Sequence, residues 1–91
     1  MIRPVPIELS DIQWATLARQ FRLARRELEA TRGIFEGKKH ALIAWQSGLQ
    51  EYSVLSNWRR AKRKLNCRDR NDLLHLIYNM ILRGEVPGRE R

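Results

Sequence analysis

The feature of the sequence best suited to chemistry is a cluster of basic residues. Positions 59 to 70 hold one acid, Asp69, and seven cations: Arg59, Arg60, Lys62, Arg63, Lys64, Arg68 and Arg70. Guanidinium and ammonium groups form charge-assisted hydrogen bonds with phosphate oxygens, and arginine can also pair bidentately with guanine. The cluster therefore predicts a polyanionic partner. Nucleic acid is the simplest such partner, and a membrane surface is the competing one.

The whole chain repeats this bias. Its 91 residues include 18 basic and 10 acidic ones, for a net charge of +8. Such a balance implies an acidic partner, and the length suits one domain. The most apolar run, from Leu73 to Leu82, is interrupted by His75 and Asn79 and is too short to span a bilayer. The single cysteine, Cys67, cannot form an internal disulfide. We expect a cytoplasmic, nucleoid-associated protein that does not bind membranes.

Helical signals cover most of the chain. Ser10 and Gln13 have the spacing of a capping box, and apolar residues continue at helical spacing to Phe35. This region is compatible with one long helix or with two that meet near positions 22–25. Gly37 is a typical helix end. A short helix is expected at 39–46, burying Leu42, Ile43 and Trp45.

The second half of the chain predicts two more helices. Gly48 marks a tight break before a helix at Glu51–Leu65, where Asn66 can end the helix in the left-handed conformation. A last helix is expected from about Asp69 to Arg83. No segment alternates with the period of a strand. The predicted fold is all-α, with four to five helices, a helix-turn-helix and an N-terminal helical extension.

The helix Glu51–Leu65 has two different faces. Apolar residues recur at i, i+4, i+7 and i+11, and these are Val54, Trp58, Ala61 and Leu65. This face predicts core packing, which also fits Trp58 better than a role as a stacking platform. The other faces carry the cations. A short helix, a glycine-containing break and a longer basic helix are typical of a helix-turn-helix that places its second helix in a DNA groove. A merely solvated basic face is the alternative.

Several segments in order resemble the LuxR-type (GerE, NarL, FixJ) helix-turn-helix domain. They are Arg26-Glu27-Leu28-Glu29, Glu36-Gly37-Lys38, Ile43-Ala44, Gly48-Leu49-Gln50-Glu51-Tyr52-Ser53-Val54 and Arg63-Lys64-Leu65-Asn66-Cys67-Arg68-Asp69-Arg70. The resemblance covers Leu23 to Gly84. It implies a four-helix domain, usually dimeric, that regulates transcription in bacteria or on a mobile element. Residues 1–22 would then form an arm and extra helix, 23–84 a stand-alone domain, and 85–91 a flexible basic tail.

The resemblance also implies roles for single residues. Glu27 would pair with a basic group and, with Gly48, support the fold. The positions that face base edges are Leu55, Ser56 and Arg59. The resemblance also places Ser53, Lys62 and Lys64 along the DNA backbone. Because half or more of protein–DNA hydrogen bonds go to the backbone, Arg60 and Arg63 are expected to contact phosphates too, and a phosphate contact is the alternative for Arg59. The chain departs from the family at Leu55, where a polar residue is common, at Asn57, which replaces histidine, and at Gln50, which replaces the usual Ser or Thr cap.

The last helix is apolar on more than one side. Leu73, Leu74, Ile77 and Ile81 form one stripe, and a second apolar surface consists of Leu76, Tyr78 and Met80. A helix with two apolar faces has to bury both. A homodimer interface at the second surface explains this pattern, and packing of the N-terminal helix against it is the alternative.

Catalytic and metal sites are not indicated. No nucleophile–base motif or glycine-rich phosphate loop is visible, and His40, His75 and Cys67 match no zinc spacing. We therefore expect no enzyme activity, catalytic residue, metal or cofactor. The leading hypothesis is a homodimeric, sequence-specific regulator that binds double-stranded DNA. The alternative is a protein-interaction module that binds another regulator or RNA polymerase through the helix Ser10–Phe21 and the last helix.

Overall fold

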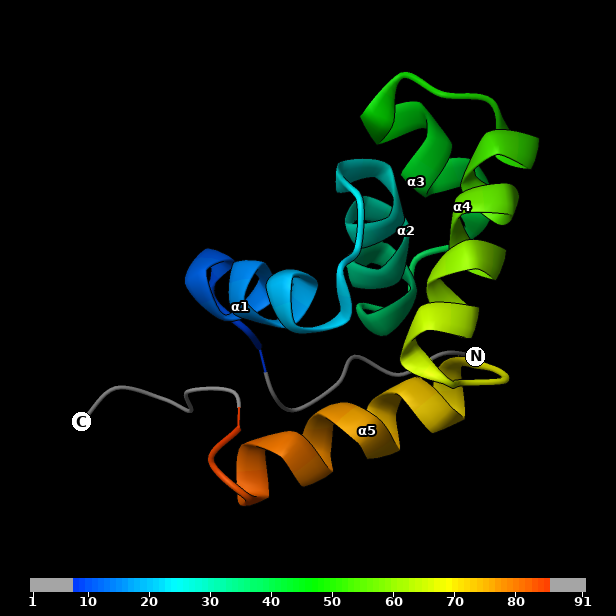
Figure 1. Ribbon diagram of the computed structural model, residues 1–91. Helices are drawn as coiled ribbons and strands as arrows, with labels where there is room; N and C mark the ends of the chain where they lie inside the picture. Colours follow the sequence, from blue (N-terminus) through cyan, green and yellow to red (C-terminus); the bar gives the residue numbers. More distant parts are fainter. Residues whose placement is uncertain (1–7, 86–91) are drawn as a thin grey trace.

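The computed structural model describes residues 8–85, which form five α-helices and no strand (Figure 1). The helices are α1 Asp11–Phe21, α2 Arg25–Phe35, α3 His40–Ser47, α4 Glu51–Leu65 and α5 Arg70–Leu82. The all-α prediction is confirmed. The predicted N-terminal arm falls largely at 1–7 and the predicted basic tail largely at 86–91, so both lie outside the described residues.

The segment from Ser10 to Phe35 forms two helices rather than one. The predicted capping box opens α1: the Gln13 N–H donates to Ser10 Oγ at 3.2 Å, and the Ser10 N–H donates to Gln13 Oε1 at 2.6 Å. The helix ends because Arg22 adopts the left-handed conformation, with φ 57° and ψ 44°. The Leu23 N–H then donates to the Ala18 carbonyl at 2.8 Å, which closes the last turn.

The predicted ends of α3 and α4 are confirmed. Gly48 has φ 69° and Asn66 has φ 58°, both left-handed. The residue after each one donates back into the helix, Leu49 to Ala44 and Cys67 to Lys62, at 2.9 Å in both cases. Gln50 caps α4 without a side-chain hydrogen bond, as its residue type leads one to expect. Residues 48–50 alone therefore separate α3 from α4.

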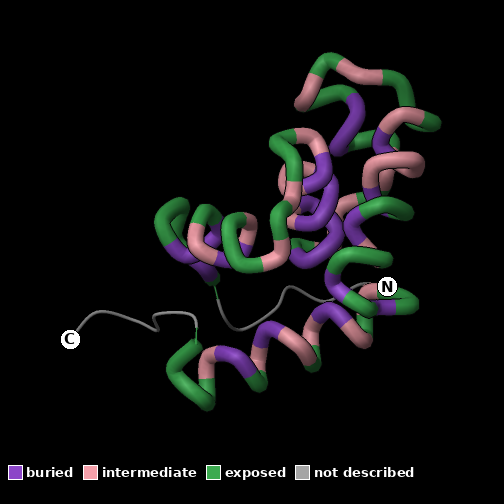
Figure 2. The backbone as a smooth tube through the Cα atoms, in the orientation of Figure 1, coloured by how far each residue is buried: buried purple, intermediate pink, exposed green. Residues whose placement is uncertain are grey.

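The core lies where α2 meets the other helices (Figures 1 and 2). Trp14 of α1 and Phe35 of α2 are both 1% exposed and meet edge to face, with ring centroids 5.3 Å apart. The extra helix α1 thus shares the core of the other four. The predicted packed face of α4 is confirmed, because all four of its apolar residues are buried: Val54, Trp58, Ala61 and Leu65.

Two contacts fix the neighbours of α2. Gly33 is buried against Ile43 of α3, where a β-carbon on Gly33 would lie 2.6 Å from Ile43 Cδ1. Arg70 at the start of α5 donates from Nε to the Ile34 carbonyl at 2.8 Å and from Nη2 to the Phe35 carbonyl at 3.0 Å. The Ile34 carbonyl also accepts from the Gly37 N–H at 3.0 Å, so Arg70 adds a side chain distant in sequence to the cap at the end of α2.

The burial expected for α3 is partly wrong. Ile43 is buried, but Leu42 is 42% exposed and Trp45 is 80% exposed. The inner face of this eight-residue helix is occupied by Ile43 and Ala44, which are 4% exposed. Leu42 and Trp45 are three residues apart on the opposite face, so both side chains point to solvent.

Met80 is also a correction. It was expected at a dimer surface, yet it is 1% exposed and belongs to the core of the single chain. The buried stripe of α5 is Leu73, Ile77 and Met80, at spacing i, i+4 and i+7. Leu76 is half-buried against the core and Tyr78 is half-buried. The surface left for a second copy therefore lacks Met80.

Candidate nucleic-acid interface

The outer face of α4 is not covered by any other helix (Figure 1). Successive residues of a helix turn by about 100°. Ser56 and Arg63 therefore lie nearly opposite the buried Val54, Trp58, Ala61 and Leu65, with Arg59 next to them. Ser56 is half-buried, while Arg59 and Arg63 are exposed. One helix thus carries a packed face and an open cationic face.

The three residues predicted to read bases differ in position. Arg59 and Ser56 belong to the outer face. Leu55 is half-buried and lies on the flank that also carries Lys62. Ser53, predicted to touch phosphate, is half-buried in the first turn, where its carbonyl accepts from Asn57 Nδ2 at 2.8 Å. Leu55 therefore lies at the margin of the outer face rather than at its centre.

A buried carboxylate organises the flank of α4 that faces α2. Glu27 Oε1 accepts from Lys64 Nζ at 2.7 Å, and Glu27 Oε2 lies 3.6 Å from Arg60 Nε. The Glu27 side chain is 6% exposed, whereas Arg60 and Lys64 keep 51% and 38% of theirs exposed. Glu27 also accepts from the Ala24 N–H at 2.8 Å, which caps the start of α2. The acid thus pairs with basic groups, in the way the resemblance implies for this position.

These contacts change the acidity of Glu27. Burial alone would raise the pKa of its carboxyl group. The hydrogen bonds from Lys64 and from the Ala24 N–H, together with the positive charges of Lys64 and Arg60, outweigh burial and hold the pKa below its ordinary value. Glu27 is therefore ionised at neutral pH, and Arg60 and Lys64 are partly engaged within the protein.

The opposite flank of α4 borders a surface hollow. Lys62 Nζ lies 5.7 Å from the centroid of the Trp58 ring, a cation–π contact that leaves the ammonium hydrogens free for another acceptor. The hollow measures 360 Å³ and its lining includes Lys38, Lys39, His40, Lys62 and Arg68. Cations thus lie on both sides of the outer face of α4.

The cations of residues 8–85 fall into two groups. Most on α2 and near the two ends of α5 are bound to protein: Arg25 and Arg26 pair with Glu29, Arg32 with Asp11 and Glu36, Arg68 with Asp72, and Arg83 with Glu85. A second group makes no ion pair, side-chain hydrogen bond or cation–π contact with any described residue, and it consists of Arg19, Arg22, Lys39, Arg59 and Arg63. The unpaired cations lie on α4, at the end of α1 and just before α3.

Sequence reasoning found Arg59 and Arg63 but missed Arg22 and Lys39. These two residues lie outside the basic cluster at 59–70. Arg22 ends α1 and Lys39 precedes α3, and sequence patterns at helix ends predict the backbone conformation rather than the surface charge. The signal that could have found Arg22 is the lack of an acid three or four residues away in either direction. Lys39 has Glu36 three residues before it, so this signal would not have found Lys39.

The histidines and the cysteine form no cluster. Within residues 8–85, no group of three or more His, Cys, Asp or Glu side chains is placed to hold a metal ion. Cys67 is 9% exposed, and its thiol lies 3.6 Å from the Leu65 carbonyl. Burial, with the charges of Asp72 and Asp69, raises the pKa of this thiol. Cys67 thus behaves as a small buried residue with a protonated thiol.

None of the helices within residues 8–85 has the length and apolar content needed to cross a membrane. Comparisons of the chain with known protein families, with characterised proteins and with solved structures found no match.

Proposed function

We propose that the chain is a sequence-specific regulator of transcription that binds double-stranded DNA. In this proposal α3, residues 48–50 and α4 form a helix-turn-helix, and α4 lies in the major groove. The observation that carries the proposal is the pair of unpaired arginines, Arg59 and Arg63, on the uncovered face of a helix whose other face is buried. Such arginines are free to bind an anion without breaking any contact of the fold.

The flanks of α4 support the same partner. The major groove is about 12 Å wide and admits one helix between two rows of phosphates. Lys62, Lys39 and Arg68 lie on one flank of α4, and the exposed parts of Arg60 and Lys64 lie on the other. The one acid on α4 is Glu51, in its first turn, at the end farthest from the cluster. A helix with cations on both sides matches the geometry of a groove bordered by two phosphate rows.

The roles within the site follow from exposure and pairing. Arg59 reads a base, with Ser56 beside it, and Leu55 meets a thymine methyl group at the edge of the contact. Arg63, Lys62 and Ser53 bind phosphates. Arg60 and Lys64 orient α4 through Glu27 and add a weaker attraction for the backbone. The resemblance to the LuxR-type domain supports this assignment, because α2 to α5 fall within the segment from Leu23 to Gly84.

A homodimer is the second part of the proposal. The exposed side of α5 carries Tyr78, half-buried, and Leu82, which is 82% exposed, with Leu76 at its edge. Two copies joined along α5 would present two copies of α4 to one face of the duplex. The operator would then consist of inverted half-sites about one helical turn apart.

Binding to two duplexes tests the proposal. The affinity for the DNA upstream of the protein's own gene is compared with that for a random duplex of equal length, across a salt series. We expect tighter binding to the upstream DNA at every salt concentration. Equal affinity for both duplexes would exclude a site-specific regulator, whatever the salt slope, because nonspecific binding is also salt-dependent. Light scattering of the same sample gives the oligomeric state.

A different observation supports a second candidate function, a protein-interaction module. Ile12 on α1 is 75% exposed and Leu82 on α5 is 82% exposed. Each side chain could be covered by the apolar surface of a partner. In this case the chain would bind RNA polymerase or another regulator, and Ile12→Asp or Leu82→Asp would abolish the complex in sedimentation while Arg59→Ala would leave it intact. The reverse pattern would exclude this candidate.

A further inference from the structure

Arg22 occupies a backbone position that its residue type does not favour. Three helices of the described chain end in a left-handed residue: α1 at Arg22, α3 at Gly48 and α4 at Asn66. Glycine and asparagine are the residues that adopt this conformation readily. The sequence thus has an arginine where the backbone conformation alone would favour Gly or Asn. The presence of arginine at position 22 therefore has to be explained by what its side chain does.

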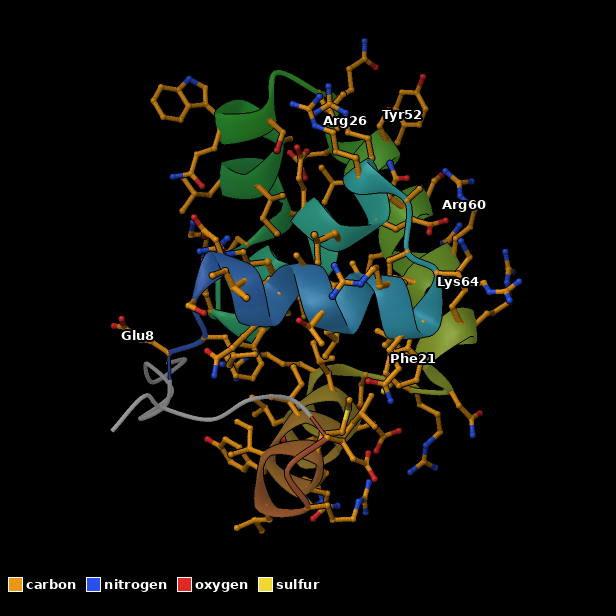
Figure 3. All side chains as sticks on the ribbon, turned by 60° about the vertical axis from the view of Figure 1, so that its left-hand side comes forward. Glu8, Phe21, Arg26, Tyr52, Arg60 and Lys64 are labelled. Atoms are coloured by element: carbon orange, nitrogen blue, oxygen red, sulfur yellow. The ribbon has the colours of Figure 1, made fainter. Side chains whose placement is uncertain are left out.

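The position of Arg22 places it beside α4. Lys64 Nζ donates to the Arg22 carbonyl at 2.9 Å, which holds the junction between α1 and α2 against the second half of α4. Figure 3 shows Arg60 and Lys64 along the same edge of the molecule, the edge at which α1 ends. The junction is therefore continuous with the flank of α4 that carries these two cations.

The electrostatic surroundings of Arg22 are positive. The acid closest to this flank, Glu27, is buried and already accepts from Lys64 and Ala24. Arg22 is exposed, and so is Arg19 one turn earlier, and within residues 8–85 neither makes an ion pair or a side-chain hydrogen bond. An arginine that is unpaired, exposed and next to further cations has an unmet capacity to bind an anion.

We propose that Arg22 contacts a backbone phosphate of the duplex that α4 binds, so that the DNA-binding surface extends from α4 onto the α1–α2 junction. This inference rests on the proposed function. A helix in the major groove is bordered by phosphate rows, and duplex DNA carries one charge per about 1.7 Å of its axis. The flank with Arg60 and Lys64 faces one of these rows, and Arg22 extends that flank beyond the helix.

Substitution of Arg22 tests the inference without damage to the fold. Arg22→Asn removes the charge and suits the left-handed backbone, so its thermal midpoint should equal or exceed that of the original chain. We expect the slope of log K against log salt to decrease by about 0.9, the value of one phosphate contact. If the two lines meet near 1 M salt, affinity at 0.1 M falls about eightfold. Arg22→Lys keeps the charge and should keep the slope.

Arg83→Asn is the matched control. It removes the same charge at the far end of α5, where Arg83 is paired with Glu85. The duplex affinity of this variant should stay within about twofold of the original. Equal weakening by Arg22→Asn and Arg83→Asn would overturn the inference, because net charge alone would then explain both. An unchanged Arg22→Asn beside a weakened Arg59→Ala would overturn it while leaving the proposed function intact. Binding is also measured for the original chain at about 50 mM salt, where phosphate contacts are strong. If the original chain binds no duplex there, both the inference on Arg22 and the proposed function are overturned.

Discussion

Lys64 Nζ lies 2.7 Å from Glu27 Oε1, and this pair joins α4 to the first turn of α2 across 37 residues of sequence. The same carboxylate caps α2 through the Ala24 N–H, and Lys64 also binds the Arg22 carbonyl. One ion pair therefore connects both ends of the α1–α2 junction to α4. A buried acid, 6% exposed, thus adds to the packed apolar face in holding the cationic helix.

Glu27→Gln should lower the free energy of unfolding. The amide oxygen can still accept from the Ala24 N–H, but the charge that attracts Lys64 and Arg60 is lost. Solvent weakens these ion pairs, because Lys64 and Arg60 are both more than a third exposed. We expect the free energy of unfolding to fall by about 1–2 kcal/mol at pH 7, measured by urea unfolding. Glu85→Gln, which removes an exposed acid paired with Arg83, is the control and should cost less than about 0.5 kcal/mol.

The cost of Glu27→Gln should depend on pH. The pKa of Glu27 is lower in the folded chain than its ordinary value of 4.5, so its contribution is present above that value. It is lost as the pH falls below 4.5 and through the folded-state pKa. The difference in stability between the original chain and the variant should therefore shrink in acid. A difference that stays constant from neutral pH to strong acid would contradict this reading.

Gly33→Ala should destabilise the contact between α2 and α3. The new β-carbon would lie 2.6 Å from both Cδ1 and Cγ1 of Ile43, so one helix or the isoleucine has to shift. Overpacking costs about 1–3 kcal/mol, and the gain in helix propensity from alanine returns about 0.5–1 kcal/mol. We expect a net loss near 1 kcal/mol in urea unfolding. In an Ile43→Ala background the same change should become neutral or stabilising, and strict additivity would show that the two residues do not collide.

The three tryptophans should respond differently to solvent. Trp45 is 80% exposed, whereas Trp14 and Trp58 are 1% and 6% exposed. Iodide should quench the fluorescence of the original chain strongly and that of Trp45→Phe weakly. Trp45→Ala should change stability by less than about 0.5 kcal/mol, and Trp14→Ala should cost about 3–5 kcal/mol. Weak quenching of the original chain would mean that a second copy or another segment covers Trp45.

Arg59→Ala should weaken binding to the best DNA site by about 1–3 kcal/mol and relax the sequence preference, because the proposed base contact would be lost. Arg25→Ala is the control, since this arginine is 83% exposed on α2 and pairs with Glu29. Both variants are titrated against the best duplex and a random one. Equal weakening on both duplexes by Arg59→Ala would make Arg59 a phosphate contact instead of a reader.

Signals within one or two turns of sequence predicted the helices well. The capping box at Ser10, the break at Gly48 and the left-handed Asn66 each depend on a residue type with a marked backbone preference, and each is found in the structure. The break at Arg22 could not be fixed in advance, because arginine carries no such preference. It is stabilised by a turn closed within the backbone and by Lys64, 42 residues away.

Burial was harder to predict where a helix is apolar on several sides. On α3 and α5 the spacing of apolar residues allows more than one inner face, and the choice depends on where the neighbouring helices lie. Leu42, which is 42% exposed, and Met80, which is 1% exposed, therefore lie in other environments than their spacing predicts.

The sequence also could not tell which cations of the basic cluster are paired within the protein. The composition of the cluster indicates an anionic partner, but the location of Glu27 decides that Lys64 is paired and Arg63 is not. Base contact, phosphate contact and dimerisation remain predictions.

The separation of the two faces of α4 has an evolutionary consequence. Val54, Trp58, Ala61 and Leu65 hold the helix in place, while Ser56, Arg59 and Arg63 take no part in the core. Substitutions at these outer positions leave the fold intact, so they can accumulate one at a time. Substitutions on the inner face destabilise the fold and are removed by selection. Under the proposed function, a lineage with this architecture can change its DNA preference while its scaffold stays the same.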